Sequence, residues 1–267
     1  MIHIGEKYTT LIPNNPFNTT GGFFSDCTMR LYYITLYYTN YTKAPDVIDG
    51  SKQFLLYKLN EDEDNTKDFF ADTELSIHHE GPIDFYVNDQ LHREYRSLAF
   101  SHITPFVKKY FSPSQLILDK KNKLLEKYSI DTTNTIGVYY RGTDKHTEIK
   151  KVNYSEYMNK VKEIYTGTQT ILIQSDEKQF IDFAKDIFPN CVVFTETKVS
   201  STDKGIHYEN TKEENWHDIQ YFLASVLILS ECKHIVTGIS NCSLWISLYR
   251  GHSINLHQNF YGNFISS

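Results

Sequence analysis

The sequence has no excess of positive charge and no long apolar run. Its 267 residues include 27 lysines and arginines against 33 aspartates and glutamates, a net charge of −6, and no basic block stands out. A nucleic-acid partner is therefore not expected. No apolar stretch reaches the roughly 18 residues that a membrane helix needs, and no basic and apolar leader follows Met1. The sequence thus predicts neither a membrane span nor a signal peptide.

Cysteine is scarce, and two common catalytic motifs are missing. The cysteines show neither a Cys-x-x-Cys pair nor a metal-ligand spacing with histidine: Cys27, Cys191, Cys232 and Cys242. We expect free, buried thiols in a reducing compartment, and hence a cytoplasmic protein. The chain also has no Gly-x-Ser-x-Gly motif and no Gly-x-Gly-x-x-Gly after a predicted strand. These absences argue against a serine hydrolase and a dinucleotide-dependent oxidoreductase.

What the sequence does contain is a regular alternation of apolar runs and helical patterns from about residue 131 onward. The runs predicted as buried strands are residues 136–140, 170–174, 191–195, 234–237 and 253–256. Helical periodicity lies between them, in residues 154–164, 180–187, 218–232 and 242–249. Alternating strands and helices predict an α/β fold with a parallel, doubly wound sheet.

The first half of the chain is less regular. The pair Gly21-Gly22 precedes an apolar-periodic segment, which indicates a glycine loop that opens a helix. Strands are predicted at residues 54–59 and 83–87, and helices at 91–110 and 116–128. We therefore predict a smaller, irregular α/β lobe over residues 1–130 and a Rossmann-like, doubly wound lobe over 131–267. The ligand is expected in the cleft between them.

Residues 136–145 (IGVYYRGTDK) are the most informative segment. The predicted strand stops at Tyr140 and delivers Arg141, Gly142, Thr143, Asp144 and Lys145 into a loop. Ligands of open α/β sheets bind outside the carboxyl ends of the strands. A guanidinium fork suits bidentate phosphate recognition, and the lysine adds a point charge. The alternative is a surface turn whose charges only keep the protein soluble.

This segment resembles the first signature of the fucosyltransferase superfamily, whose pattern runs roughly Gly-Val-His-x-Arg-Arg-x-Asp-Lys. The superfamily includes the α1,6-fucosyltransferases, the nodulation fucosyltransferases and the protein O-fucosyltransferases. Three further stretches match in the same order: residues 171–177 (ILIQSDE), 188–189 (FP) and 222–243. The similarity covers about residues 130–257. It implies a GT-B-like, inverting, metal-independent glycosyltransferase that moves fucose from GDP-fucose to a glycan or another hydroxyl acceptor.

The resemblance also implies roles for individual residues. Arg141 aligns with the arginine that stabilises the departing β-phosphate; the alternative is a structural ion pair with Asp144 or another carboxylate. Ser240 and Asn241 open a helix, where they either contact a phosphate or only cap the helix. Glu148 is the candidate general base, with Asp144 and Lys145 as alternatives. A purely solvating Glu148 is the competing interpretation.

Three departures from the superfamily pattern bear on the donor base. Tyr139 replaces the histidine, Gly142 replaces the second arginine, and Ser225 stands where an aspartate is expected, with Asp218 two helical turns upstream. Because that histidine and aspartate help to recognise guanine in the α1,6 enzymes, a UDP-sugar or another GDP-sugar rivals GDP-fucose as the donor. The predicted donor site consists of Gly21, Gly22, Tyr139, Arg141, Gly142, Lys145, Ser175, Asp176, Asp218, Ser225, Ser240 and Asn241.

Two other hypotheses remain open. Asp62-Glu63-Asp64 matches the Asp-x-Asp metal motif of GT-A transferases, but it lacks the strand context expected of a Mn²⁺ site. We therefore predict no metal and no cofactor. The second hypothesis is a non-catalytic glycan- or nucleotide-binding protein on the same scaffold. The short chain and the missing second arginine favour it, whereas the retention of Arg141, Asp144, Lys145 and Ser240 argues against it.

Overall fold

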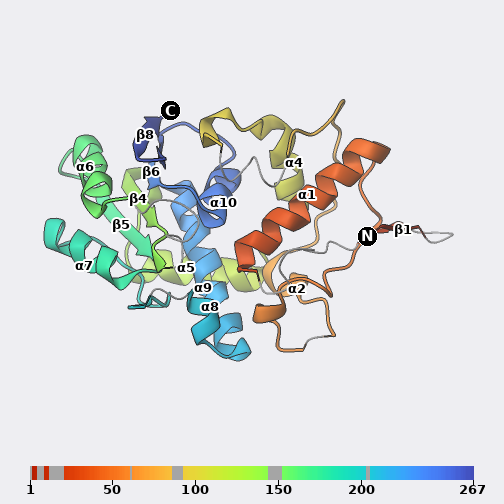
Figure 1. Ribbon diagram of the computed structural model, residues 1–267, viewed down its shortest axis with the longest axis horizontal. Helices are drawn as coiled ribbons and strands as arrows, with labels where there is room; N and C mark the ends of the chain where they lie inside the picture. Colours follow the sequence, from red (N-terminus) through yellow and green to blue (C-terminus); the bar gives the residue numbers. More distant parts are fainter. Residues whose placement is uncertain are drawn as a thin grey trace.

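A five-stranded sheet forms the centre of the C-terminal half (Figure 1). The computed structural model describes residues 2–4, 9–11, 21–60, 62–85, 93–143, 152–202 and 205–267. The sheet has the order β5-β4-β6-β7-β8, in which the first four strands run parallel and β8 pairs antiparallel with β7. The strands are β4 (Thr135–Tyr140), β5 (Thr170–Ser175), β6 (His234–Thr237), β7 (Leu256–Phe260) and β8 (Asn263–Ser266). This parallel-dominated sheet confirms the predicted α/β class.

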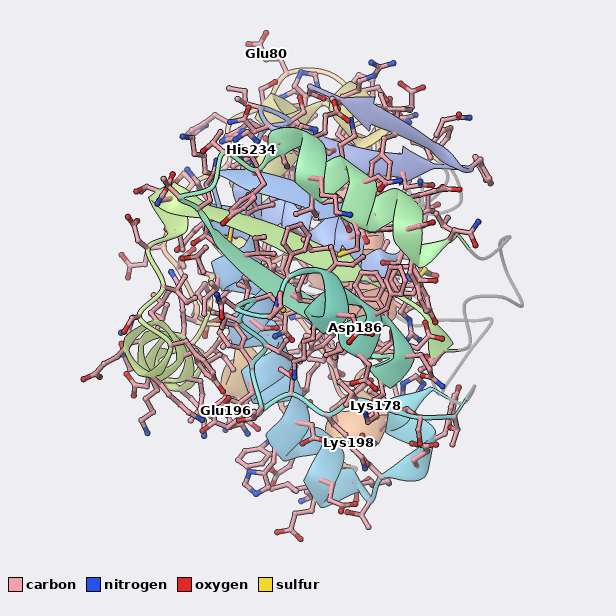
Figure 2. All side chains as sticks on the ribbon, turned by 90° about the vertical axis from the view of Figure 1, so that its left-hand side faces the viewer. Glu80, Lys178, Asp186, Glu196, Lys198 and His234 are labelled. Carbon is pink, nitrogen blue, oxygen red and sulfur yellow. The ribbon has the colours of Figure 1, made fainter. Side chains whose placement is uncertain are left out.

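Helices cover both faces of the sheet (Figures 1 and 2). Helices α6 (Tyr154–Ile164) and α7 (Lys178–Ile187) pack on one face, against Ile136, Val138 and Tyr140. On the other face lie α5 (Gln115–Lys127), α9 (Lys212–Glu231) and α10 (Asn241–Arg250). Gly137 lets α9 approach closely, because a Cβ there would lie 2.9 Å from Leu229 Cδ2. The alternation along β4 thus gives each helical layer its own apolar surface.

The N-terminal half is built around helix α1 (Phe23–Tyr41). Short strands β1 (Ile2–Ile4), β2 (Thr9–Leu11) and β3 (Val47–Ile48) form a small separate sheet. The other elements are η1 (Leu55–Tyr57), α2 (Thr66–Phe69), η2 (Tyr95–Ser97) and α4 (Phe100–Tyr110). Phe24 of α1 contacts Phe222 of α9 and Trp245 of α10. A single apolar core therefore includes side chains from both halves of the chain. The lobe boundary near residue 130 stays a prediction.

Several predicted strands are not strands. Residues 54–59 contain the 3₁₀ turn η1 instead of a strand, because Phe54 takes a left-handed conformation (φ 57°) that ends an extended run. Residues 191–195 contribute only an isolated bridge between Val192 and Leu172. No strand includes residues 83–85, and residues 86–87 lie outside the described part of the chain. In each case apolar side chains pack into the core without the backbone pairing that a strand needs.

The structure also describes the four thiols and the character of the helices. All four cysteines are free, and Cys27, Cys232 and Cys242 are buried, whereas Cys191 is partly exposed. Burial raises the pKa of the Cys232 thiol and of the Cys242 thiol to about 12, which makes both unreactive. Among the helices that the structure describes, none combines the length and apolar character needed to cross a bilayer.

A buried carboxyl group in α1 predicts a pH-dependent stability. Asp26 is 5% exposed, and its Oδ2 accepts a hydrogen bond from the Phe54 backbone N–H (2.8 Å). Burial raises the pKa of Asp26 to about 7, although that hydrogen bond and the charge of Lys58 oppose the shift. The unfolded chain loses this proton near pH 4, so between about pH 4 and 7 only the folded state holds it.

The free energy of unfolding should therefore fall as the pH rises from about 4 to 7 and level off above that, with a change of at most about 4 kcal/mol. Asp26→Asn should remove most of this fall. Urea unfolding at several pH values measures it. An Asp26→Asn variant with the same pH dependence as the wild-type protein would show that other groups cause it.

Candidate functional site

A pocket of about 300 Å³ lies at the carboxyl ends of β4 and β5. Its walls also include the starts of α1 and α10 and one side of α9, together with α8 (Ile206–Glu209). Segments far apart in the sequence thus meet around one cavity. The predicted site residues that line it are Gly21, Gly22, Tyr139, Arg141, Ser175, Asp176, Asp218, Ser240 and Asn241.

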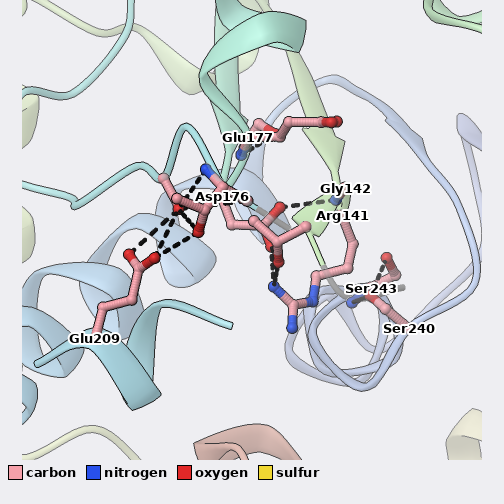
Figure 3. Close-up of polar contacts among 11 residues, drawn as sticks. Arg141, Gly142, Asp176, Glu177, Glu209, Ser240 and Ser243 are labelled. Atoms are coloured by element: carbon pink, nitrogen blue, oxygen red, sulfur yellow. Dashed lines mark hydrogen bonds and ion pairs between the residues drawn. The ribbon is translucent and has the colours of Figure 1, made fainter. Parts of the chain in front are cut away.

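Asp176 holds the loop that follows β4 (Figure 3). Its carboxylate forms an ion pair with Arg141 Nη1 and accepts hydrogen bonds from the Gly142 backbone N–H (2.8 Å) and from Thr143 Oγ1 (2.5 Å). Asp176 directly follows β5, and Ser175 lies opposite Tyr140 in the parallel register. The two strand ends therefore present the carboxylate and the guanidinium to each other. The predicted ion pair of Arg141 exists, and its partner is Asp176.

The ion pair does not take Arg141 out of the pocket. Its side chain is 23% exposed, whereas that of Asp176 is 7% exposed, and both residues line the cavity. A guanidinium has five N–H donors, and Arg141 Nη1 also donates to Thr143 Oγ1 (2.9 Å). The charge of Asp176 reduces the local positive potential, but it also fixes the orientation of the arginine. Asp176 thus holds the Arg141 guanidinium in a fixed position at the carboxyl ends of β4 and β5.

Gly142 has a steric role in this loop. A Cβ at this position would lie 2.1 Å from Glu177 Oε2 and 2.6 Å from Glu177 Cβ. The residue is buried and does not contribute to the pocket lining. The glycine that stands in place of the second superfamily arginine therefore makes room for Glu177. Gly142 lies behind the pocket lining, and its contact with a donor stays a prediction.

Ser240 is the N-cap of α10. Its Oγ accepts a hydrogen bond from the Ser243 backbone N–H (3.0 Å) and lies 2.8 Å from Ser243 Oγ (Figure 3). The N-cap interpretation is confirmed, and Ser240 also lines the pocket. A phosphate contact stays a prediction. The capped start of α10 nevertheless directs the positive end of a helix dipole toward the cavity.

The first turn of α1 reaches the same cavity. Gly21, Gly22 and Ser25 line the pocket, and Gly22 is the N-cap residue of α1 without a side-chain cap. The Phe23 backbone N–H donates to the hydroxyl of Tyr57 (3.1 Å), which also lines the pocket. Two helix N-termini from opposite halves of the chain therefore point at one cavity beside Arg141. Such an arrangement attracts anions.

A second part of the pocket is formed by α9. Asp218, Ile219 and Phe222 lie on one side of this helix and line the cavity. Asp218 Oδ2 accepts a hydrogen bond from Asn210 Nδ2 (2.7 Å), and burial raises the pKa of its carboxyl group. Asn210 Oδ1 in turn accepts from Lys198, which lies beside the segment leading into α8 and α9 (Figure 2). This part of the pocket combines apolar surface with a half-buried carboxylate.

Sequence analysis overlooked Gln174 of β5. It is 1% exposed, its Oε1 accepts from Thr197 Oγ1 (2.9 Å), and both residues line the pocket. Its Nε2 is buried, with no hydrogen-bond partner in the described part of the chain. A buried amide without a partner costs about 1–3 kcal/mol. The signal that could have identified it is the polar glutamine inside the otherwise apolar run ILIQS.

The remaining predicted residues lie elsewhere. Ser225 is wholly buried within α9 and its Oγ donates to the Phe222 carbonyl (2.7 Å), so it does not line the pocket, whereas Asp218 does. Asp144, Lys145 and Glu148 lie outside the described residues.

The Asp-x-Asp motif contributes to local structure. Asp64 accepts hydrogen bonds from the backbone N–H groups of Gly50 and Thr66, so it links two segments of a loop. The described residues contain no group of three metal-ligating side chains.

Comparisons with known proteins identify the fold. No family model and no curated protein matches the sequence. The structure is similar to that of NodZ α1,6-fucosyltransferase in a crystal soaked with GDP-fucose, with a TM-score of 0.59 and 14% sequence identity. This match covers 96% of our chain and 97% of that chain. The protein therefore shares the α/β fold of this fucosyltransferase, and this is the fold that the resemblance in the motifs predicted.

Two further matches are partial. NodZ α1,6-fucosyltransferase co-crystallized with GDP matches over 58% of our chain and 48% of its own, at a TM-score of 0.41 and 14% identity. A mutant of Arabidopsis thaliana FUT1 in complex with GDP matches over 64% and 38%, at a TM-score of 0.36 and 14% identity. The chain thus spans less than half of the length of these two structures. At such TM-scores they carry no argument about the site.

Proposed function

We propose that the protein is a glycosyltransferase that uses a nucleoside diphosphate sugar, with GDP-fucose as the donor that the motif resemblance favours. It transfers the sugar with inversion to a hydroxyl group of a glycan. The observation that carries this proposal is the pocket in which Arg141 lies beside the N-termini of α1 and α10, at the carboxyl ends of parallel strands. The similarity in fold to a fucosyltransferase supports it.

The proposed chemistry follows from the charges around the pocket. In this reaction the acceptor oxygen attacks the anomeric carbon while the bond to the β-phosphate breaks, so negative charge grows on the departing diphosphate. A fixed cation and oriented helix N-termini stabilise that charge more than the ground state. Asp176 supports this role because its ion pair and its hydrogen bond to the Gly142 N–H preorganise Arg141. The diphosphate then lies between Arg141 and Ser240.

The part of the pocket beside α9 suits the nucleobase. Phe222 and Ile219 offer apolar contact, and the carboxylate of Asp218 is an acceptor. Guanine presents two adjacent N–H donors on one edge, which a carboxylate accepts together, whereas uracil presents one. Asp218 already accepts one hydrogen bond, from Asn210, but a carboxylate has about four lone-pair positions. These features support GDP over UDP.

The acceptor side of the reaction stays a set of predictions. Glu148 is the proposed general base, with Asp144 as the alternative, and neither belongs to the described residues. We propose that no metal ion takes part, as the resemblance to metal-independent enzymes implies. The hydrogen bonds that Asp64 accepts from Gly50 and Thr66 support this, because they occupy one carboxylate of the Asp-x-Asp motif. The lobe formed by residues 1–130 is the proposed acceptor side.

A non-catalytic nucleotide-binding protein is the second candidate function. The ion pair between Arg141 and Asp176 favours it, because a carboxylate partner lowers the positive potential that a leaving phosphate meets. The two functions differ in turnover. A transferase releases GDP from GDP-fucose in the presence of an acceptor, and slowly by hydrolysis without one, whereas a binding protein returns the donor intact. Chromatography of donor incubated with the protein separates these outcomes.

Nucleotide binding is tested by thermal unfolding with GDP, UDP, CDP, ADP and their common sugar conjugates, with and without EDTA. A ligand at 100 times its Kd stabilises the native state by about 2.7 kcal/mol, which raises the Tm by roughly 5 °C or more for a chain of this size. We expect a dose-dependent rise with GDP and GDP-fucose that EDTA leaves unchanged. A rise in Tm only with UDP-sugars would show that the donor carries uracil instead of guanine. No rise with any of these ligands would contradict the proposed function.

A further inference from the structure

Helices α1 and α10 are joined by hydrogen bonds beneath the pocket. Thr28 Oγ1 donates to Asn241 Oδ1 (2.9 Å), and Trp245 Nε1 donates to Thr28 Oγ1 (3.0 Å). Thr28 Oγ1 also lies 2.8 Å from the Phe24 carbonyl oxygen, so its single proton is shared between two acceptors. Thr28 is 1% exposed and Trp245 is completely buried. One hydroxyl group from the N-terminal half thus connects two residues of α10.

These contacts determine how Asn241 faces the pocket. Asn241 is the first residue of α10 after its N-cap, and it lines the cavity next to Ser240. A side-chain amide has an acceptor end and a donor end, and the contact with Thr28 engages the acceptor, Oδ1. A phosphate oxygen, which only accepts hydrogen bonds, would therefore bond to the amino end, Nδ2. It adds a donor beside the backbone N–H groups at the start of the helix.

We propose that Thr28 is a positioning residue for the diphosphate of the donor, acting through Asn241. The inference rests on the proposed function, since it assigns the occupant of the pocket to a nucleoside diphosphate. Trp245, one helical turn after Asn241, completes the arrangement by donating to the same hydroxyl group. The N-terminal half thereby controls a phosphate contact that the C-terminal half makes. Thr28 itself does not line the pocket.

The test is the affinity for GDP and for guanosine of four proteins: wild type, Thr28→Val, Thr28→Ser and Thr35→Val. Valine keeps the shape of threonine and removes the hydroxyl group. Thr35 is the matched control, because it lies two turns further along α1 and is also 1% exposed. Among the described residues, its hydroxyl bonds within the helix, to the carbonyls of Leu31 and Tyr32 (both 3.0 Å). Titration calorimetry well below the melting temperature measures each Kd.

We expect Thr28→Val to weaken GDP binding about 10-fold, the size of one hydrogen bond to a charged group, and to change guanosine binding less than about 2-fold. Thr28→Ser, which keeps the hydroxyl group, should restore most of the affinity, and Thr35→Val should bind GDP within about 2-fold of the wild type. In a double-mutant cycle, Thr28→Val should add little to Asn241→Ala, because both remove the same contact.

Three outcomes overturn the inference alone: unchanged GDP affinity in Thr28→Val, equal losses for GDP and guanosine, or additive losses in the cycle with Asn241→Ala. The last two would mean that the hydroxyl group only stabilises the core. A wild-type protein that binds neither GDP nor guanosine overturns the proposed function itself, and the inference with it. The two failures are therefore distinguishable in the same experiment.

Discussion

Arg141→Ala is expected to lower kcat/KM for sugar transfer by about 10²–10³-fold, because removing a group that stabilises charge in the transition state costs roughly this much. Most of the loss should appear in kcat, since the negative charge on the diphosphate grows as the glycosidic bond breaks. Steady-state kinetics with GDP-fucose and an acceptor glycan measure it. Arg141→Lys should recover only part of the rate, because an ammonium group lacks the planar fork of the guanidinium.

A matched control is available on the surface. Arg96 also pairs with a carboxylate, that of Glu94 (2.7 Å), but its side chain is 49% exposed and it does not line the pocket. Arg96→Ala should therefore keep the wild-type rate. A near-normal kcat in Arg141→Ala would reject the proposed role of Arg141. If the variant binds GDP normally and the wild-type protein shows no turnover at all, the non-catalytic function is the better description.

Asp176→Asn is expected to lower both stability and activity. Asparagine keeps an oxygen for the Gly142 N–H but removes the charge that pairs with Arg141. Removing one partner of a buried ion pair costs about 3–5 kcal/mol. Because the Arg141 side chain is 23% exposed and therefore partly solvated, we expect about 2–3 kcal/mol. The rate should fall about 10-fold or more, since the arginine loses its fixed orientation.

Urea unfolding and steady-state kinetics on the same preparation separate the two effects. The control is Asp182→Asn, which removes an exposed i,i+4 pair with Lys178 on α7. Such pairs contribute about 0.3–0.5 kcal/mol, so this variant should differ little from the wild type. If Asp176→Asn instead accelerates transfer, then the carboxylate inhibits the enzyme by neutralising Arg141, and its supporting role is wrong.

Much of the C-terminal half was predictable because its signals are local. The run ending at Tyr140 has the length and the apolar content of a buried strand, and it becomes β4. Residues 234–237 become β6 for the same reason. The residue types that follow β4 place a cation at the edge of the sheet, because parallel strands bring their carboxyl ends together. Arg141, Ser175 and Ser240 accordingly meet in one pocket.

The N-terminal half was harder because its order comes from packing among aromatic side chains. Phe23 contacts Phe54, Tyr57 and Phe69, which are separated in sequence by loops and short turns. Such a cluster leaves no periodic pattern, so the residues around Phe54 resemble a strand in sequence and form a 3₁₀ turn in space. Periodicity detects an element with one buried face, and a short turn buried on several sides lacks that signature.

The sequence by itself determined the α/β class, the strand that ends just before Arg141 and the capped start of α10, because each depends on residues that are neighbours in the chain. Only the tertiary structure decided that Asp176 is the partner of Arg141 and that Ser225 faces away from the pocket. It also joined Thr28 to Asn241 across 213 positions. These contacts depend on strand register and on the rotation of each helix about its axis. Both are set by how the whole core packs, and no local pattern of residues encodes them.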